Sequence, residues 1–157
     1  MQVLKSLHLY IDATHDNYQQ DMLNLTSLRY VKDFNITLVG VNSIEILKIF
    51  NDFQISSLTL LNGDLKFLNN ESLTGFSTLK SLTLHDKKTY SIPKQMKTLT
   101  DLTLIYNSNV TFEKGSFYGF SNLKYLSFVY FPETSDLHEY NKTSNCIKMG
   151  AFLDSTN

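Results

Sequence analysis

The chain has few of the residues that identify several protein classes. Its 157 residues include one cysteine, no tryptophan, two prolines and six glycines. A scaffold held by internal disulfides needs paired cysteines, so that class is excluded for this segment. Because Pro and Gly are scarce, no linker is visible, and no low-complexity segment occurs. We therefore expect one domain over residues 1–157.

The chain also has no large excess of positive or negative charge. Fourteen Lys and Arg stand against fifteen Asp and Glu, for a formal net charge of −1, and no block of like charges occurs along the chain. A nucleic-acid-binding domain typically carries a basic stripe, so we predict no nucleic-acid footprint. The longest apolar run, ITLVGV, is far shorter than the roughly 20 residues of a spanning helix. The N-terminal segment MQVLKSLHLYID lacks the pattern of a secretory signal peptide. We predict no membrane span in this segment.

Motifs for catalysis and metal binding are missing from the sequence as well. The four histidines, His8, His15, His85 and His138, are scattered, and His138 and Cys146 have no recognised ligand spacing. No G-x-S-x-G and no phosphate-binding glycine loop occurs. We predict that the chain is not an enzyme and holds no cofactor or metal. Cys146 leaves two interpretations open, a disulfide with a cysteine outside this sequence or a buried thiol.

What the chain does contain is a repeated apolar spacing. In KGSFYGFSNLKYLSF, at 114–128, apolar residues recur at steps of three, three, three and two. Six copies of L-x-x-L-x-L, with some apolar substitutions, begin at residues 4, 25, 55, 79, 99 and 123. The intervals are 21, 30, 24, 20 and 24 residues. Repeats of about 20–29 residues with this pattern are the signature of a leucine-rich repeat.

The chain therefore resembles the leucine-rich-repeat family over nearly its whole length. The resemblance implies an α/β solenoid of about six repeats, with a parallel concave sheet and an irregular convex side. The six strands are expected near 6–9, 27–30, 57–60, 81–84, 101–104 and 125–128. The ninth motif position, normally an Asn whose amide bonds neighbouring turns, matches only at Asn107. Asp12 and Asp33 are partial substitutes, so the repeats are divergent.

One return segment predicts a helix near 43–53 on the convex side. In NSIEILKIFNDF, Asn42 and Glu45 have the spacing of a capping box. An amphipathic stripe follows at Ile46, Ile49, Phe50 and Phe53. Such a stripe can face a membrane or a partner, but we favour packing on the core of the solenoid.

Neither end of the repeat array has the polar capping repeat that solenoids need. The first motif begins at Leu4, with little sequence before it to cover it. At the other end, MGAFLDSTN aligns with KGSFYGFSN, which continues into a motif strand. We therefore expect the chain to be an uncapped fragment of a longer array.

Within the family, the chain is most similar to Toll-like receptor ectodomains and related extracellular receptors. The similarity rests on the F-x-x-F-x-x-L-x-x-L lead-in, the irregular intervals and the sequons. Five N-x-S/T sequons are candidate glycosylation sites, with chance occurrence as the alternative: Asn24, Asn35, Asn70, Asn109 and Asn141. Two of them, Asn35 and Asn109, are expected in equivalent exposed loops.

The resemblance implies a binding function on the extracellular side of a membrane receptor. It implies pattern recognition in innate immune signalling, with a protein, carbohydrate or microbial ligand and a second receptor chain as partners. The alternative is an intracellular leucine-rich-repeat scaffold or adaptor in the cytoplasm, which mediates protein–protein interaction.

Residues between the motif leucines are expected to face outward from the concave sheet and form the candidate binding face. The fifth motif positions are His8, Arg29, Thr59, Thr83, Thr103 and Ser127. The seventh are Tyr10, Val31, Leu61, His85, Ile105 and Val129. The seventh-position column is mostly apolar. Local packing against the following loop is its favoured interpretation, and a contact strip for a partner is the alternative.

Overall fold

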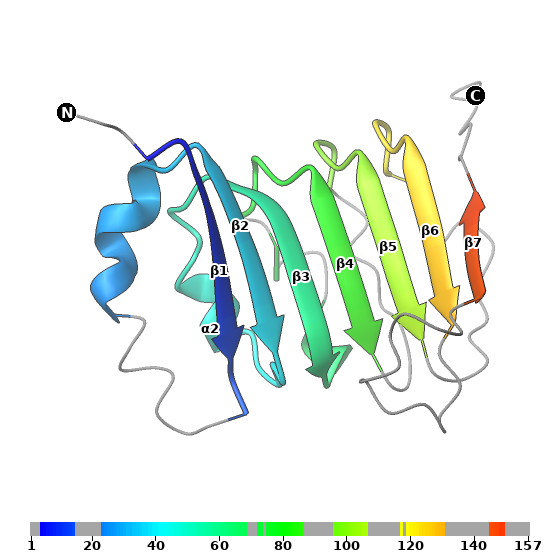
Figure 1. The fold of residues 1–157 in the computed structure, drawn as a ribbon, viewed down its shortest axis with the longest axis horizontal. Coiled ribbons are helices and arrows are strands. Elements are labelled where there is room, and N and C mark those ends of the chain that lie inside the picture. Colours follow the sequence, from blue (N-terminus) through cyan, green and yellow to red (C-terminus); the bar gives the residue numbers. More distant parts are fainter. Residues whose placement is uncertain are drawn as a thin grey trace.

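The chain forms a seven-stranded sheet whose spatial order follows the sequence (Figure 1). The computed structural model describes residues 4–14, 23–68, 72–73, 75–86, 96–106, 117, 119–130 and 145–149. The first six strands of the sheet are parallel: β1 (Ser6–Asp12), β2 (Asp33–Val39), β3 (Ile55–Gly63), β4 (Ser81–Asp86), β5 (Asp101–Tyr106) and β6 (Tyr125–Tyr130). Each of these strands pairs with the next. The arrangement is solenoid-like, as predicted.

A backbone turn before four of the strands explains the apolar steps of three. In each turn the amide of the first motif residue donates to the carbonyl three residues earlier, at 3.0–3.2 Å. The donor and acceptor pairs are Val31 and Leu28, Leu79 and Phe76, Leu99 and Met96, and Leu123 and Phe120. A turn of this kind brings residues i and i+3 to one side, whereas a strand does so for i and i+2. The switch from three to two therefore marks where each turn becomes a strand.

The strand predicted at 27–30 is wrong. This segment belongs to η1 (Leu23–Tyr30), a 3-10 helix, which lies beside β1 in Figure 1. Side chains at i and i+3 eclipse in a 3-10 helix, so Leu25 and Leu28 share one face of it. Tyr30, which would have been an inward motif residue, is 77% exposed.

Strand β2 instead uses a second copy of the motif, six residues further on. Val31, Phe34 and Ile36 occupy its apolar positions, and all three are buried. Measured from Val31, the intervals between motif starts become 27, 24, 24, 20 and 24 residues, which is more regular than the predicted set.

The apolar core lies between the sheet and the return segments. Paired residues of successive strands form inward columns, of which one runs through Leu58, Leu82, Leu102 and Leu126. The ring of Phe34 lies 5.5 Å from that of Phe53, and the ring of Phe50 lies 5.5 Å from Phe53 as well. This continuous packing supplies the burial that no single repeat achieves alone.

A short helix, α2 (Glu45–Lys48), lies behind the first strands within the predicted range 43–53. Its N-cap is Ile44, with no side-chain cap hydrogen bond, so the capping box predicted at Asn42 is wrong. Of the predicted stripe, Ile46, Phe50 and Phe53 are buried in the core, together with Leu47. Ile49, the remaining residue of the stripe, is 36% exposed and does not belong to the buried core. The packing interpretation is confirmed for the buried residues.

The two edges of the sheet differ. Strand β7 (Asn145–Met149) pairs antiparallel with β6, so the parallel order stops there. At the opposite edge, β1 alternates exposed and half-buried residues, and Leu4 is 51% exposed. The expected continuation of the repeat at Phe152 lies outside the described residues.

The residues at the ninth motif position lie in different settings. The Asp12 carboxylate accepts from the Thr14 amide at 2.9 Å in a local turn, and Asp33 is a residue of β2. The position in β3 is Gly63, where a Cβ atom would lie 2.3 Å from the Val41 carbonyl oxygen of the preceding coil. Glycine thus permits a close backbone approach, and the Asp64 amide donates to that carbonyl at 3.1 Å. Asp64 also caps η2 (Leu65–Phe67). Asn107 lies outside the described residues.

Candidate functional site

The front face of the sheet carries an in-register row of hydroxyl groups. The row crosses six strands through Tyr10, Thr37, Thr59, Thr83, Thr103 and Ser127. Four of these, from Thr59 to Ser127, are half-buried, Tyr10 is 64% exposed, and Thr37 is buried. Because neighbouring strands lie about 4.8 Å apart, the hydroxyls form a regular array on a rigid surface. Such an array can donate and accept hydrogen bonds along its length.

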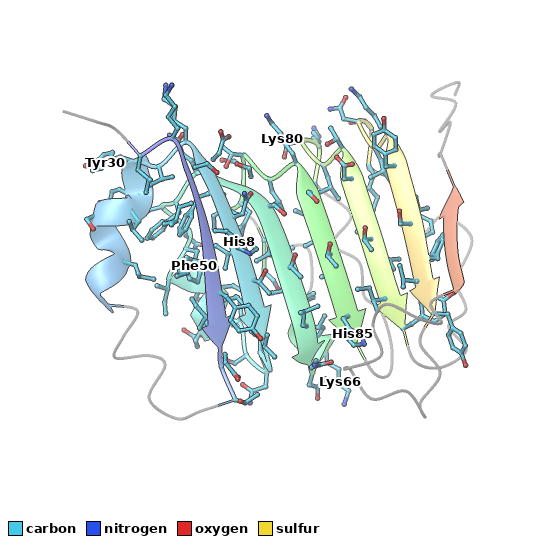
Figure 2. The ribbon with its side chains drawn as sticks, in the orientation of Figure 1. His8, Tyr30, Phe50, Lys66, Lys80 and His85 are labelled. Carbon is cyan, nitrogen blue, oxygen red and sulfur yellow. The ribbon has the colours of Figure 1, made fainter. Side chains whose placement is uncertain are left out.

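A second polar row runs beside the first, through His8, Asn35, Ser57, Ser81, Asp101 and Tyr125. His8 was predicted in the row of Thr59 but lies in this one. In the pairing of β2 with β3, Asn35 lies opposite Ser57 and not opposite Thr59, so the first two strands are displaced by two residues relative to the motif register of the later ones. His8 Nε2 and Thr37 Oγ1 are hydrogen-bonded at 2.9 Å, which connects the two rows (Figure 2).

Two predicted site residues do not lie on this face. Arg29 belongs to the 3-10 helix η1, and Val31 is a buried core residue, 5% exposed. Both predictions are wrong because they assumed a motif starting at residue 25. Asn35 and Thr37 take the front-face places in β2.

The apolar column at the seventh motif position is largely covered. His85 is 5% exposed and Ile105 is 4% exposed, while Leu61 and Val129 are half-buried. Burial of this degree favours local packing at the centre of the column over a contact strip. The polar rows are therefore the more accessible part of the predicted site.

The predicted glycosylation sites fall in different places. Asn24 lies in η1, and Asn35 lies within β2, between β1 and β3, so its expected place in an exposed loop is wrong. Asn70, Asn109 and Asn141 lie outside the described residues. Cys146 is a residue of β7 and pairs through its backbone with Val129 of β6.

The part of the chain that the structure describes contains neither a metal-binding cluster nor a membrane-spanning helix. Across the ranges described above, no cluster of three or more His, Cys, Asp or Glu side chains is placed to hold a metal ion. Within those ranges, no helix reaches the length and apolarity needed to cross a membrane.

The sequence reasoning missed a row of lysines at the edge where the strands begin. Lys32, Lys80 and Lys124 each occupy the second motif position, directly before or at the start of a strand. All three are exposed. Counting like charges along the chain does not reveal them, because they come together only through the register of the coils. The expectation that no basic stripe exists needs correction for this edge.

Comparisons of the chain with protein-family models, with curated proteins and with solved structures found no match. A functional assignment therefore rests on the residues and their geometry.

Proposed function

We propose that the chain is a binding module of the leucine-rich-repeat type, part of an extracellular pattern-recognition receptor, rather than an enzyme. The observation that carries the proposal is the pair of polar rows on the front of a rigid parallel sheet. Groups that are already ordered before binding lose little conformational entropy when they contact a ligand. A face of this kind suits recognition of a protein or carbohydrate surface rich in hydrogen-bonding groups.

The front face is tested by blocking it with bulky charge. Thr83 and Thr103 pair directly and lie at its centre. An array of purified microbial polysaccharides and proteins first identifies a ligand for the unmodified protein. We expect Thr83→Arg or Thr103→Arg to weaken its binding by more than about tenfold, since an unpaired charge at an interface is costly.

Two controls accompany these variants. Thr83→Ser keeps the hydroxyl and should bind nearly as the unmodified protein does. Asp52→Arg introduces the same side chain at an exposed position of the return segment behind the sheet. Front-face variants that bind normally, or a comparable loss in Asp52→Arg, would refute the assignment of this face.

The extracellular location is tested on the natural protein in its own cells. Removal of N-linked glycans should reduce its apparent mass, and protease added outside intact cells should cleave it. An unglycosylated, protected protein would reject the receptor proposal in favour of an intracellular scaffold.

A further inference from the structure

An open trough of about 560 Å³ runs across the N-terminal ends of the parallel strands. It has two walls, each built by one residue position repeated in successive coils. The first wall is the second motif position and alternates lysine with hydroxyl: Lys32, Ser56, Lys80, Thr100 and Lys124. Backbone hydrogen bonds of 2.8–2.9 Å fix this order. The Lys80 amide donates to the Ser56 carbonyl, the Thr100 amide donates to the Lys80 carbonyl, and the Lys124 amide donates to the Thr100 carbonyl.

The second wall is the residue just before each motif. It carries hydroxyl and amide groups: Gln54, Thr78, Thr98 and Asn122. Thr78 Oγ1 donates to the Ile55 carbonyl at 2.9 Å, and Asn122 Nδ2 donates to the Lys97 carbonyl at 2.5 Å. These bonds orient both side chains and leave their oxygen atoms able to accept from a ligand.

The lysines of the trough are available for a ligand. Among the described residues, Lys48 forms an ion pair with Glu45 and Lys66 forms one with Asp64. No ion pair among these residues involves a lysine of the trough. One carboxylate, Asp33, lines the trough against three lysines, and a second, that of Asp101, accepts from the hydroxyl of the wall residue Thr100. The protein as a whole has a net charge of −1, so this local positive charge is not a consequence of a basic chain. Its field favours an anion.

The spacing of the charges indicates the kind of anion. Lysines on alternate strands lie roughly 10 Å apart, because neighbouring strands are separated by about 4.8 Å. A nucleic-acid strand carries one phosphate per roughly 3.4 Å, so most of its charges would find no lysine. Single-stranded nucleic acids also need aromatic platforms for stacking, and none of the described residues that line the trough is aromatic. A linear chain with sparse charges and many hydroxyl groups fits better.

We propose that this trough binds an acidic polysaccharide along its length. The lysines pair with sulfate or carboxylate groups, and the hydroxyl and amide groups between them bond the sugar hydroxyls. This site is separate from the front face, so each can fail without the other.

The proposal is tested by measuring binding to heparin and polygalacturonate, which carry sulfate and carboxylate groups respectively among their anions. The informative variant is Lys80→Gln with Lys124→Gln. The matched control is Lys48→Gln with Lys66→Gln, which removes the same charge elsewhere. Figure 2 shows Lys80 near the N-terminal ends of the strands and Lys66 near their C-terminal ends. All four lysines are exposed, and equal urea midpoints will verify folding.

We expect the trough variant to lose about 2- to 25-fold in affinity for heparin, polygalacturonate or both, and more than the control, since each exposed ion pair contributes up to about fivefold. The control should lose less than about twofold, and uncharged dextran should bind much more weakly than either polyanion. Preference for one polyanion identifies the anionic group. The proposal is overturned by an equal loss in the control, by no binding to either polyanion at low salt, or by equal binding of dextran. Tighter binding of single-stranded poly(dT) or polyglutamate would also overturn it, in favour of another class of polyanion.

Discussion

Replacing Phe34 with Ala tests which residues of the second repeat face the core. Phe34 is fully buried and packs against Phe53, whereas Tyr30 is 77% exposed. Truncation of a buried Phe costs about 3–5 kcal/mol, of which about 0.5–1.5 kcal/mol is the loss of the aromatic pair. Domains of this kind have a free energy of unfolding of roughly 5–15 kcal/mol. Phe34→Ala should therefore remove a large share of the stability, and Tyr30→Ala should change it by less than about 0.5 kcal/mol.

Urea unfolding followed by circular dichroism measures this difference. With a slope of roughly 2 kcal/mol per M, the midpoint of Phe34→Ala should fall by roughly 2 M. If that variant does not fold, Ile36→Val remains measurable, with an expected cost of about 0.5–1.5 kcal/mol. Equal effects at Tyr30 and Phe34, or a larger effect at Tyr30, would show that the strand begins at the earlier motif and that the structural register is wrong.

Two further stability predictions use the same urea assay. Leu102 is 1% exposed, so Leu102→Ala should lower the free energy of unfolding by about 2–5 kcal/mol. Thr103→Ala, on the front face, should change it by less than about 0.5 kcal/mol. Similar losses in the two variants would contradict the assignment of Leu102 to the inward side of β5 and Thr103 to the outward side. Gly63→Ala should cost about 1–3 kcal/mol, because its Cβ would lie 2.3 Å from the Val41 carbonyl oxygen, which is backbone and cannot rotate away. An unchanged midpoint at Gly63 would mean that the two coils are further apart than described.

The second repeat shows how far the motif alone could be trusted. A search for three apolar positions accepted Leu25, Leu28 and Tyr30, because steps of three and two fit them. The longer series of steps, three, three, three and two, is satisfied only by Leu25, Leu28, Val31, Phe34 and Ile36. That series contains both the 3-10 segment and the strand, so the correct register was present in the sequence. It was missed because Val, Phe and Ile replace leucine.

The candidate site was predictable where the repeat is regular. From β3 to β6, the fifth motif positions lie side by side as predicted, as with Thr59, Thr83 and Thr103. It was not predictable between β2 and β3, where Asn35 pairs with Ser57 and not with Thr59, because this pairing depends on how the two strands fit and not on either strand's pattern. Burial of His85 and Ile105 likewise depends on tertiary packing.

The sequence by itself determined that apolar residues recur in a pattern of turn and strand, and hence that successive coils stack into a parallel sheet. Leucine spacing carries this information because turns of three residues and strands of period two place side chains on one side at different steps. Only the tertiary structure decided which polar residues become neighbours. Lys32, Lys80 and Lys124 are separated by 48 and 44 residues in the chain, and they share a trough because the coils stack about 4.8 Å apart. A surface built across coils depends on this stacking register, which no local stretch of sequence contains.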